Sequence, residues 1–429
     1  NAKLMLTDQQ IPVTVLGLSD MLKGGVDWAS FSAETPDLLT LKEGKTPRPH
    51  QLEAIEAVTK GLATADRGQM IMACGTGKTY TALQLAETMV GVGGSVLFLV
   101  PSLALLSQAL WEWTADTELP MRVFAVCSDG QVARKRGRSV DEDIDAIDLP
   151  IPPTTDPIAL AEALTQPTGD AMTVVFATYQ SLAVIHTAQE LGVAPFDLLV
   201  ADEAHRTTGA AKKGEESTFV LVHDNDYIQA AKRLYMTATP RIYTPTAKNS
   251  ADLTAITLAS MDDEKVFGPE LHHLTFGRAV REGLLTDYKV LILSTDEDEM
   301  AGIFEDGRDL TEAAKTVGVW RAINKATDNP KHLAGDADPM RTLVAFARNI
   351  KTSKAFTDEF AEVVSEYLTD KNEATTHHVA TSHIDGTMPM AQRDRLLEWL
   401  KNPANNTTHV LTNAQVLSEG VDVPSLDAV

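Results

Sequence analysis

Residues 72–79 read Met-Ala-Cys-Gly-Thr-Gly-Lys-Thr and lie between an apolar run and a helical pattern. Gly75 and Gly77 allow successive backbone N–H groups to wrap an anion, and the N-terminus of the following helix favours negative charge. Met72 stands where the general phosphate-loop pattern has its first glycine, so the segment departs from that pattern at this position. Lys78 would reach the β- and γ-phosphates, and the Thr79 hydroxyl would bind magnesium. The segment therefore predicts an ATP-binding loop, with contacts from Gly75, Thr76, Gly77, Lys78 and Thr79.

A pair of carboxylates ends a later apolar run. Residues 198–201 are Leu-Leu-Val-Ala, and Asp202-Glu203-Ala204-His205 follows them. A carboxylate at the C-terminal end of a strand can hold magnesium, and its neighbour can orient and deprotonate an attacking water. We therefore predict ATP and Mg²⁺ as cofactors, Thr79 and Asp202 as metal ligands, and a catalytic set of Lys78, Asp202, Glu203 and His205.

Gln51 lies one predicted helix before the phosphate loop, in Pro47-Arg48-Pro49-His50-Gln51. A glutamine amide can pair with N6 and N7 of adenine. Taken alone, Gln51 would be an ordinary surface residue at a helix start. Its place before the loop predicts an adenine contact.

Short apolar runs alternate with helical patterns through the chain, as they do in α/β proteins with a parallel sheet. The runs are rich in Val, Leu, Ile and Phe without strict alternation, which is typical of strands covered by helices on both faces. Strands are predicted at residues 69–73, 95–100, 173–178, 198–201 and 233–237, and helices at residues 50–62, 79–90 and 102–114.

The pattern restarts around residues 286–288. It predicts further strands at 342–347, 378–381 and 409–412 and helices at 352–367 and 391–401. An acidic, proline-containing stretch at about 138–170 predicts an insertion with one short helix at 159–164. We expect an N-terminal lead-in over 1–46, a first domain over 47–285 and a second over 286–429.

The composition limits the kind of protein. The net charge is −23, which argues against binding nucleic acid through the whole surface but not through a local basic groove. The two cysteines cannot form a disulfide framework. No apolar run reaches the roughly 20 residues of a membrane span, and no secretory signal pattern opens the chain. We therefore expect a cytoplasmic protein without a membrane partner.

These motifs stand in the order found in superfamily 2 helicases and translocases of the DEAH-box kind, which the chain resembles over nearly its full length. Thr237-Ala238-Thr239 resembles motif III, and residues 343–349 resemble motif IV. Pro101-Ser102 resembles motif Ia, and Thr178-Tyr179-Gln180-Ser181 resembles the next motif that contacts DNA. Leu411-Thr412-Asn413 with Glu419-Gly420-Val421-Asp422 resembles motif V.

The resemblance implies two RecA-like P-loop NTPase domains in tandem, the second truncated, with ATP bound between them. It implies that Gly420 and Asp422 also bind the nucleotide and that Thr237 and Thr239 couple the nucleotide site to the nucleic-acid path. Such motifs contact mostly the sugar–phosphate backbone, to which hydroxyl and guanidinium groups are suited. The nucleic-acid contacts are therefore expected at Ser102, Thr178, Arg348 and Thr412.

The finer resemblance is to the ATPase modules of restriction enzymes of type ISP, and more distantly of types I and III. It is carried by residues 177–182, 235–240 and 267–288, and by His383-Ile384-Asp385-Gly386 with Arg393. It implies a motor that moves along duplex DNA. Nuclease, methyltransferase and target-recognition parts are expected outside this chain, because no nuclease or methyltransferase motif occurs in it.

The chain stops at Val429, soon after motif V, and contains no Gln-x-x-Gly-Arg pattern. In the family that pattern carries the arginines that stabilise the transferring phosphoryl group. We therefore expect a nucleic-acid-dependent ATPase in a truncated piece, and the missing arginines leave inactivity of this piece as an open alternative. Two alternatives stay open: a DNA-repair or RNA helicase of superfamily 2, and a nucleotide-gated DNA-binding fragment without turnover.

Overall fold

The computed structural model describes residues 21, 25–35, 38, 40, 42, 44–127, 149, 151–167, 169–212, 218–244, 256–288, 290, 300–301, 303–304, 309–325, 338–373, 375, 377–386, 388, 390–414 and 426–429. The chain divides into two compact units, Asn1–Asp287 and Tyr288–Val429. Each unit has its own sheet and its own core. Gly420 and Asp422, the predicted nucleotide contacts of motif V, lie outside the described residues.

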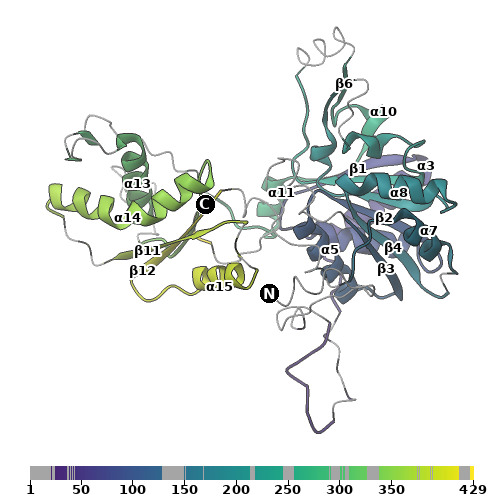
Figure 1. Cartoon of the computed structure of the whole chain (residues 1–429), viewed down its shortest axis with the longest axis horizontal. Helices are drawn as coiled ribbons and strands as arrows, with labels where there is room; N and C mark the ends of the chain where they lie inside the picture. The colour runs from purple at the N-terminus through teal and green to yellow at the C-terminus, as the bar shows by residue number, and fades with distance from the viewer. Residues whose placement is uncertain are drawn as a thin grey trace. The chain divides into compact units, whose positions relative to one another are not determined.

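Unit 1 is built on a seven-stranded sheet in the order β3-β4-β2-β5-β7-β1-β9. Figure 1 labels β1, β2, β3 and β4 of this sheet. Every neighbouring pair of strands is parallel. The strands are β1 (Arg67–Met72), β2 (Ser95–Val100), β3 (Met121–Val126), β4 (Met172–Thr178), β5 (Phe196–Ala201), β7 (Ala230–Thr237) and β9 (Glu270–Leu274).

Helices cover both faces of this sheet, because successive residues of a strand point to opposite sides. In β2, Phe98 lies in the core under the first group of helices, and Leu99 lies in the core under the second. Within the first core, Trp113 meets both Phe98 and Phe176 edge-on, and the two phenyl rings are tilted against each other. The first group is α3 (Pro49–Thr64), α4 (Lys78–Met89) and α5 (Leu103–Asp116), and the second is α7 (Pro157–Thr165) and α8 (Leu182–Glu190).

Short elements complete unit 1. An antiparallel pair, β6 and β8, forms a separate two-stranded sheet. The bounds of the short elements are η2 (Tyr179–Ser181), η3 (Ala204–Thr207), β6 (Gly209–Lys212), η4 (Val220–His223), β8 (Ile256–Ala259), α10 (Glu264–Phe267) and α11 (Phe276–Arg281).

Unit 2 holds a parallel three-stranded sheet in the order β10-β12-β11. Val410 faces the core formed with α13 and α14, and its neighbour Leu411 faces the core formed with α15. The elements are α13 (Leu310–Ile323), β10 (Thr342–Phe346), α14 (Ile350–Asp370), β11 (His378–Ile384), α15 (Met390–Lys401) and β12 (Thr407–Asn413).

The predicted parallel α/β class is confirmed, and each predicted strand and helix falls on an observed element of the same kind within a few residues. The short helix expected at 159–164 lies within α7. The sequence patterns missed β3, β9, α8, α13, the β6–β8 pair and the short helices α10 and α11. Among the described helices, none is long and apolar enough to cross a membrane.

A close main-chain crossing joins α10 to the edge strand β9. Gly268 has φ of 74°, and a Cβ at this position would overlap the main-chain carbonyl of Arg67. The Gln69 side chain donates to the main-chain oxygens of Gly268, at 2.8 Å, and Met261, at 2.9 Å. The crossing therefore needs a glycine both for its backbone conformation and for space.

We predict that Gly268→Ala lowers the free energy of unfolding of unit 1 by about 2–5 kcal/mol, from left-handed strain and overlap together. Gly283→Ala is the matched control, because Gly283 has φ of 71° and nothing within 4 Å of an added Cβ. The control should lose only about 1–2 kcal/mol. Urea unfolding followed by circular dichroism measures both, and equal losses would contradict the overlap.

Candidate active site at the carboxyl edge of the larger sheet

The carboxyl ends of five parallel strands bring the predicted residues of unit 1 to one edge. The phosphate loop follows β1, Ser102 follows β2, Asp202 follows β5, and Thr178 and Thr237 end β4 and β7. Ligands of open α/β sheets bind at this edge. The strand direction therefore assembles residues that lie far apart in the sequence.

The phosphate loop turns through two left-handed glycines, Gly75 with φ of 79° and Gly77 with φ of 84°. Thr76 lies between them and is buried, and its hydroxyl donates to the main-chain oxygen of Ala73 at 2.7 Å. Lys78 is the first residue of α4. The loop thus presents main-chain N–H groups and a helix N-terminus at the strand end, as phosphate binding requires.

Two residues at the start of α3 form hydrogen bonds with main-chain oxygens of the phosphate loop. The Gln51 amide donates to the main-chain oxygen of Gly77 at 3.3 Å, and its Oε1 accepts from Arg48 N at 2.9 Å. A Cβ on Gly77 would lie 2.5 Å from Gln51 Nε2. His50 Nε2 lies 3.0 Å from the Thr76 carbonyl oxygen, which accepts a hydrogen bond from it. Gln51 therefore contacts the loop, and adenine recognition by Gln51 stays a prediction.

The two carboxylates after β5 differ in protonation. Asp202 is only 7% exposed, and burial, followed by the charge of Glu203, raises its pKa to about 7 against the opposing charge of Lys78. Burial also acts to raise the pKa of Glu203. The hydrogen bond with His205 and the charge of Lys78 outweigh burial, so the pKa of Glu203 lies below its ordinary value. Glu203 is therefore ionised at neutral pH while Asp202 titrates there.

His205 joins this acidic pair to the end of β7. Its Nδ1 lies 3.3 Å from Glu203 Oε2 and 3.0 Å from Thr237 Oγ1. The Thr237 hydroxyl also accepts from Thr239 N at 3.1 Å. Four of the six residues predicted for catalysis and coupling, Glu203, His205, Thr237 and Thr239, are thus joined in one chain of polar contacts.

The donor set suits a magnesium ion bound partly by a nucleotide. Within the described residues, no group of three or more His, Cys, Asp and Glu side chains could hold a metal. Magnesium in nucleotide sites uses one or two carboxylates together with phosphates and water. The Asp202 carboxylate is buried, and its raised pKa shows that burial disfavours the ionised form. A bound cation would stabilise that form. Asp202 and the Thr79 hydroxyl therefore fit the ion.

In unit 1, the side chains predicted to contact nucleic acid already form hydrogen bonds within the protein. Ser102 caps α5, accepting from Leu105 N at 3.4 Å. Thr178 is 2% exposed, and its hydroxyl lies 3.1 Å from Ser181 Oγ. Both residues are at the expected edge, but the Thr178 hydroxyl is bound within its own turn.

In unit 2, Arg348 is exposed just before α14, and Thr412 is 1% exposed. The Thr412 hydroxyl lies 2.7 Å from Thr357 Oγ1 and accepts from Ser353 Oγ at 2.9 Å. Ser353 Oγ also lies 2.7 Å from His383 Nδ1. Thr412 is therefore part of a buried network, whereas Arg348 is accessible to a ligand.

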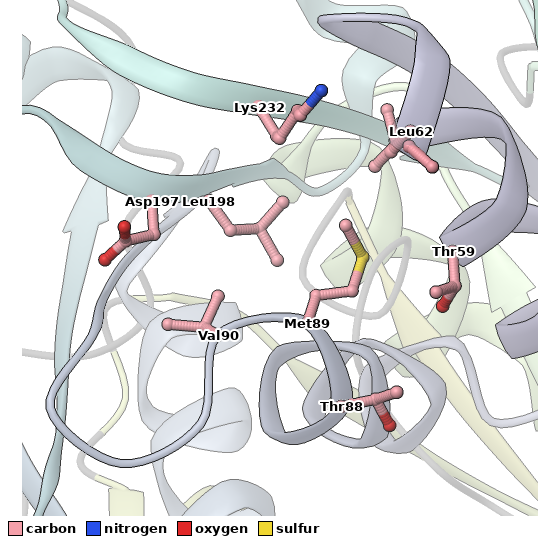
Figure 2. A pocket seen from close by; sticks show the side chains of 9 residues that line it. Thr59, Leu62, Thr88, Met89, Val90, Asp197, Leu198 and Lys232 are labelled. Carbon is pink, nitrogen blue, oxygen red and sulfur yellow. The ribbon is translucent and has the colours of Figure 1, made fainter.

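A cavity of about 360 Å³ lies at the opposite edge of the larger sheet (Figure 2). It is lined by the end of α4, at Thr88 and Met89, and by the beginnings of β5 and β7. Lys232 donates to the main-chain oxygen of Ala65 at 2.9 Å, and Asp197 accepts from Ser95 N at 2.8 Å. The two charged groups in the lining thus bind the protein itself, and the cavity is separate from the phosphate loop.

Sequence reasoning missed three supporting residues. His50 contacts the phosphate loop, Trp113 Nε1 donates to the Thr79 carbonyl oxygen at 3.0 Å, and the Tyr179 hydroxyl donates to the Asp202 carbonyl oxygen at 2.7 Å. His50 and Tyr179 each adjoin a residue that was predicted, which was the available signal. Trp113 gives no such signal, and its ring is buried in the core.

We predict that Asp202→Asn raises the free energy of unfolding at pH 8, because the buried carboxylate is ionised there. The pKa of Asp202 is about 7 in the folded state and ordinarily 3.8. As pH rises from 4 to 7, ionisation of Asp202 therefore lowers the free energy of unfolding progressively. The gain should approach an upper limit of about 4 kcal/mol at pH 8 and vanish near pH 4. Urea unfolding at pH 4.5, 6 and 8, without nucleotide or Mg²⁺, measures it. Asp197→Asn, exposed at the other end of β5, is the control, and a pH-independent gain would contradict the assignment.

Comparisons with known proteins match both units. The family "Type III restriction enzyme, res subunit" matches residues 44–242, and "Helicase conserved C-terminal domain" matches residues 337–429. The curated proteins include a type I restriction enzyme EcoAI endonuclease subunit from Escherichia coli, 27% identical over 280 residues, covering 64% of this chain and 27% of that protein. The chain spans about a third of the length of the curated relatives it matches.

Two solved structures are similar over most of the chain. The ATP-dependent Type ISP restriction-modification enzyme LlaBIII bound to DNA has a TM-score of 0.82 and 36% identity, covering 99% of this chain and 28% of that one. A nuclease-deletion mutant of the Type ISP enzyme LlaGI, in complex with a DNA substrate mimic, has a TM-score of 0.59 and 32% identity, covering 86% and 25%. The chain therefore belongs to the superfamily 2 helicases, with two RecA-like domains in tandem, and is related to the type I and type ISP restriction enzymes.

Proposed function

We propose that this chain is the ATP-driven motor module of a restriction-modification enzyme and translocates along duplex DNA. The observation that carries the proposal is the similarity to DNA-bound LlaBIII over 99% of this chain, at 36% identity. The arrangement of the phosphate loop, the acidic pair and the Thr237 hydroxyl at one sheet edge supports it, because this is the arrangement that an ATP-hydrolysing site needs.

The phosphate loop would bind the nucleotide through its main-chain N–H groups and the N-terminus of α4. Lys78 would lie against the β- and γ-phosphates, and its charge already acts on both carboxylates of the acidic pair. Gln51 and His50 would keep the loop in its binding conformation through the carbonyl oxygens of Gly77 and Thr76. Gly420 and Asp422 remain proposed nucleotide contacts.

Glu203 would take a proton from the water that attacks the γ-phosphate. The Glu203 carboxylate is ionised at neutral pH, as a general base must be. His205 orients this carboxylate and shares its Nδ1 with the Thr237 hydroxyl. Magnesium, held by Asp202 and Thr79, would neutralise charge on the phosphates.

The protein would contact the sugar–phosphate backbone of the nucleic acid, since an exposed arginine and hydroxyl groups suit phosphate oxygens. Ser102, Thr178 and Arg348 are proposed for these contacts, and Thr412 would support them from its buried network. Nuclease, methyltransferase and target-recognition functions are proposed to belong to other parts of the enzyme, because the chain covers 28% of LlaBIII.

We predict that duplex DNA stimulates phosphate release from ATP by the chain, and that Lys78→Ala lowers this rate roughly 100-fold or more, as loss of a charge-stabilising group does. Lys60→Ala, on the exposed face of α3, is the control and should keep the parent rate. A colorimetric phosphate assay with duplex DNA, single-stranded DNA and RNA measures the rates. Stimulation by RNA alone would favour an RNA helicase, and nucleotide binding without turnover would favour a gated fragment.

We predict that Arg348→Ala weakens duplex DNA binding about equally for unrelated sequences and lowers the salt dependence of the affinity by about one counterion. Loss of one phosphate contact is the physical reason. Fluorescence anisotropy across a salt series measures this. Arg321→Ala, on α13, serves as the control, and an unchanged salt slope for Arg348→Ala would exclude the contact.

A further inference from the structure

Tyr179 connects two strands that are not neighbours in the sheet. The side chain is fully buried in η2, at the end of β4, and its hydroxyl donates to the Asp202 carbonyl oxygen at 2.7 Å, just after β5. Because β2 lies between β4 and β5, the link spans two strand spacings, about 9.5 Å. Burial raises the pKa of Tyr179 well above its ordinary value, so the hydroxyl keeps its proton and remains a donor.

The Asp202 carbonyl belongs to the peptide group that joins the two carboxylates. The N–H of the same peptide donates to Asp202 Oδ1 at 2.9 Å. Glu203 has φ of 48° and ψ of 45°, a left-handed conformation that residues with a Cβ rarely adopt. Since φ of Glu203 is the rotation that follows this peptide, holding the peptide at both its oxygen and its N–H sets the plane from which that rotation starts, and so constrains where the Glu203 carboxylate points.

The same turn also contacts the segments proposed to meet nucleic acid. Thr178 and Ser181 lie on either side of Tyr179 and share a hydrogen bond of 3.1 Å. Gln180 Nε2 donates to the Pro101 carbonyl oxygen at 3.3 Å, immediately before Ser102. Thr178 and Ser181 are 2% and 3% exposed, so a phosphate would reach either hydroxyl only by displacing the turn that carries Tyr179.

We propose that Tyr179 is a positioning residue that couples nucleic acid at η2 to the orientation of Glu203 through its hydrogen bond to the Asp202 carbonyl oxygen. The inference rests on the proposed function, because it takes Glu203 as the general base and η2 as a backbone contact. Tyr179 itself touches neither the nucleotide nor the water. Its effect is on the rate of hydrolysis and not on nucleotide affinity.

Tyr179→Phe tests the proposal, because it removes the hydroxyl and leaves the buried ring against Phe219. The kcat of DNA-stimulated ATP hydrolysis should fall roughly tenfold, the effect of one lost hydrogen bond on a transition state. The KM for ATP and the affinity for duplex DNA should stay within about twofold, since Tyr179→Phe keeps every side chain proposed to contact either ligand. An unchanged kcat, or a loss confined to KM, would overturn the proposal.

Tyr235→Phe is the matched control. Tyr235 is also fully buried in the same sheet, and its hydroxyl bonds His223 Nδ1 at 3.0 Å. Both variants lose one buried hydrogen bond, so both should unfold at similarly lowered urea concentrations. Only Tyr179→Phe should lose kcat, and an equal loss in both variants would assign Tyr179 a merely structural role.

A crystal structure of Tyr179→Phe separates this inference from the proposed function. Glu203 should leave its left-handed conformation, or the Asp202–Glu203 peptide should rotate, when the carbonyl loses its donor. A Glu203 that keeps φ near 48° on an unrotated Asp202–Glu203 peptide overturns the inference whatever the enzyme does. If the parent chain hydrolyses no ATP with DNA, the proposed function fails, and the conformation of Glu203 still decides the role of Tyr179.

Discussion

The common direction of the strands in unit 1 is the constraint on which the rest of the structure depends. Because all seven strands are parallel, every segment that follows a strand emerges at the same edge. Helices on both faces then bury the strands, and the predicted site residues that follow or end β1, β2, β4, β5 and β7 come together at that edge. The site is therefore a product of chain direction, and its residues need no proximity in sequence.

Two carboxylates, those of the buried Asp202 and the partly buried Glu203, lie next to each other at this edge, and their pKa values are shifted in opposite directions. Asp202 is driven towards its neutral form by burial, while His205 and Lys78 keep Glu203 ionised. Main-chain groups take part as much as side chains do. Buried side chains donate hydrogen bonds to main-chain carbonyl oxygens of the site, those of Thr76, Gly77, Thr79 and Asp202. These hydrogen bonds hold the loops of the site in one conformation.

The sequence was sufficient for the central strands, because their apolar runs are continuous and bounded by turn signals. It was insufficient for β3 and β9, whose polar residues, such as Arg122, Glu270 and His273, break the pattern at the margins of the sheet. The phosphate loop was predictable because its chemistry is local. The link from Tyr179 to Asp202 was not, since it depends on which strand lies between β4 and β5. The burial of Thr178 and Thr412 follows from packing, which their motifs do not encode.

The left-handed conformation of Glu203 also bears on how an inactive form of this module would be made. Asparagine and glycine tolerate such a backbone better than glutamate does, so replacing Glu203 by either would relieve strain while removing the carboxylate. Glutamine would keep both the strain and the shape. A trapped complex made with asparagine would therefore differ from the parent in rigidity as well as in chemistry, and glutamine is the substitution that changes the chemistry alone.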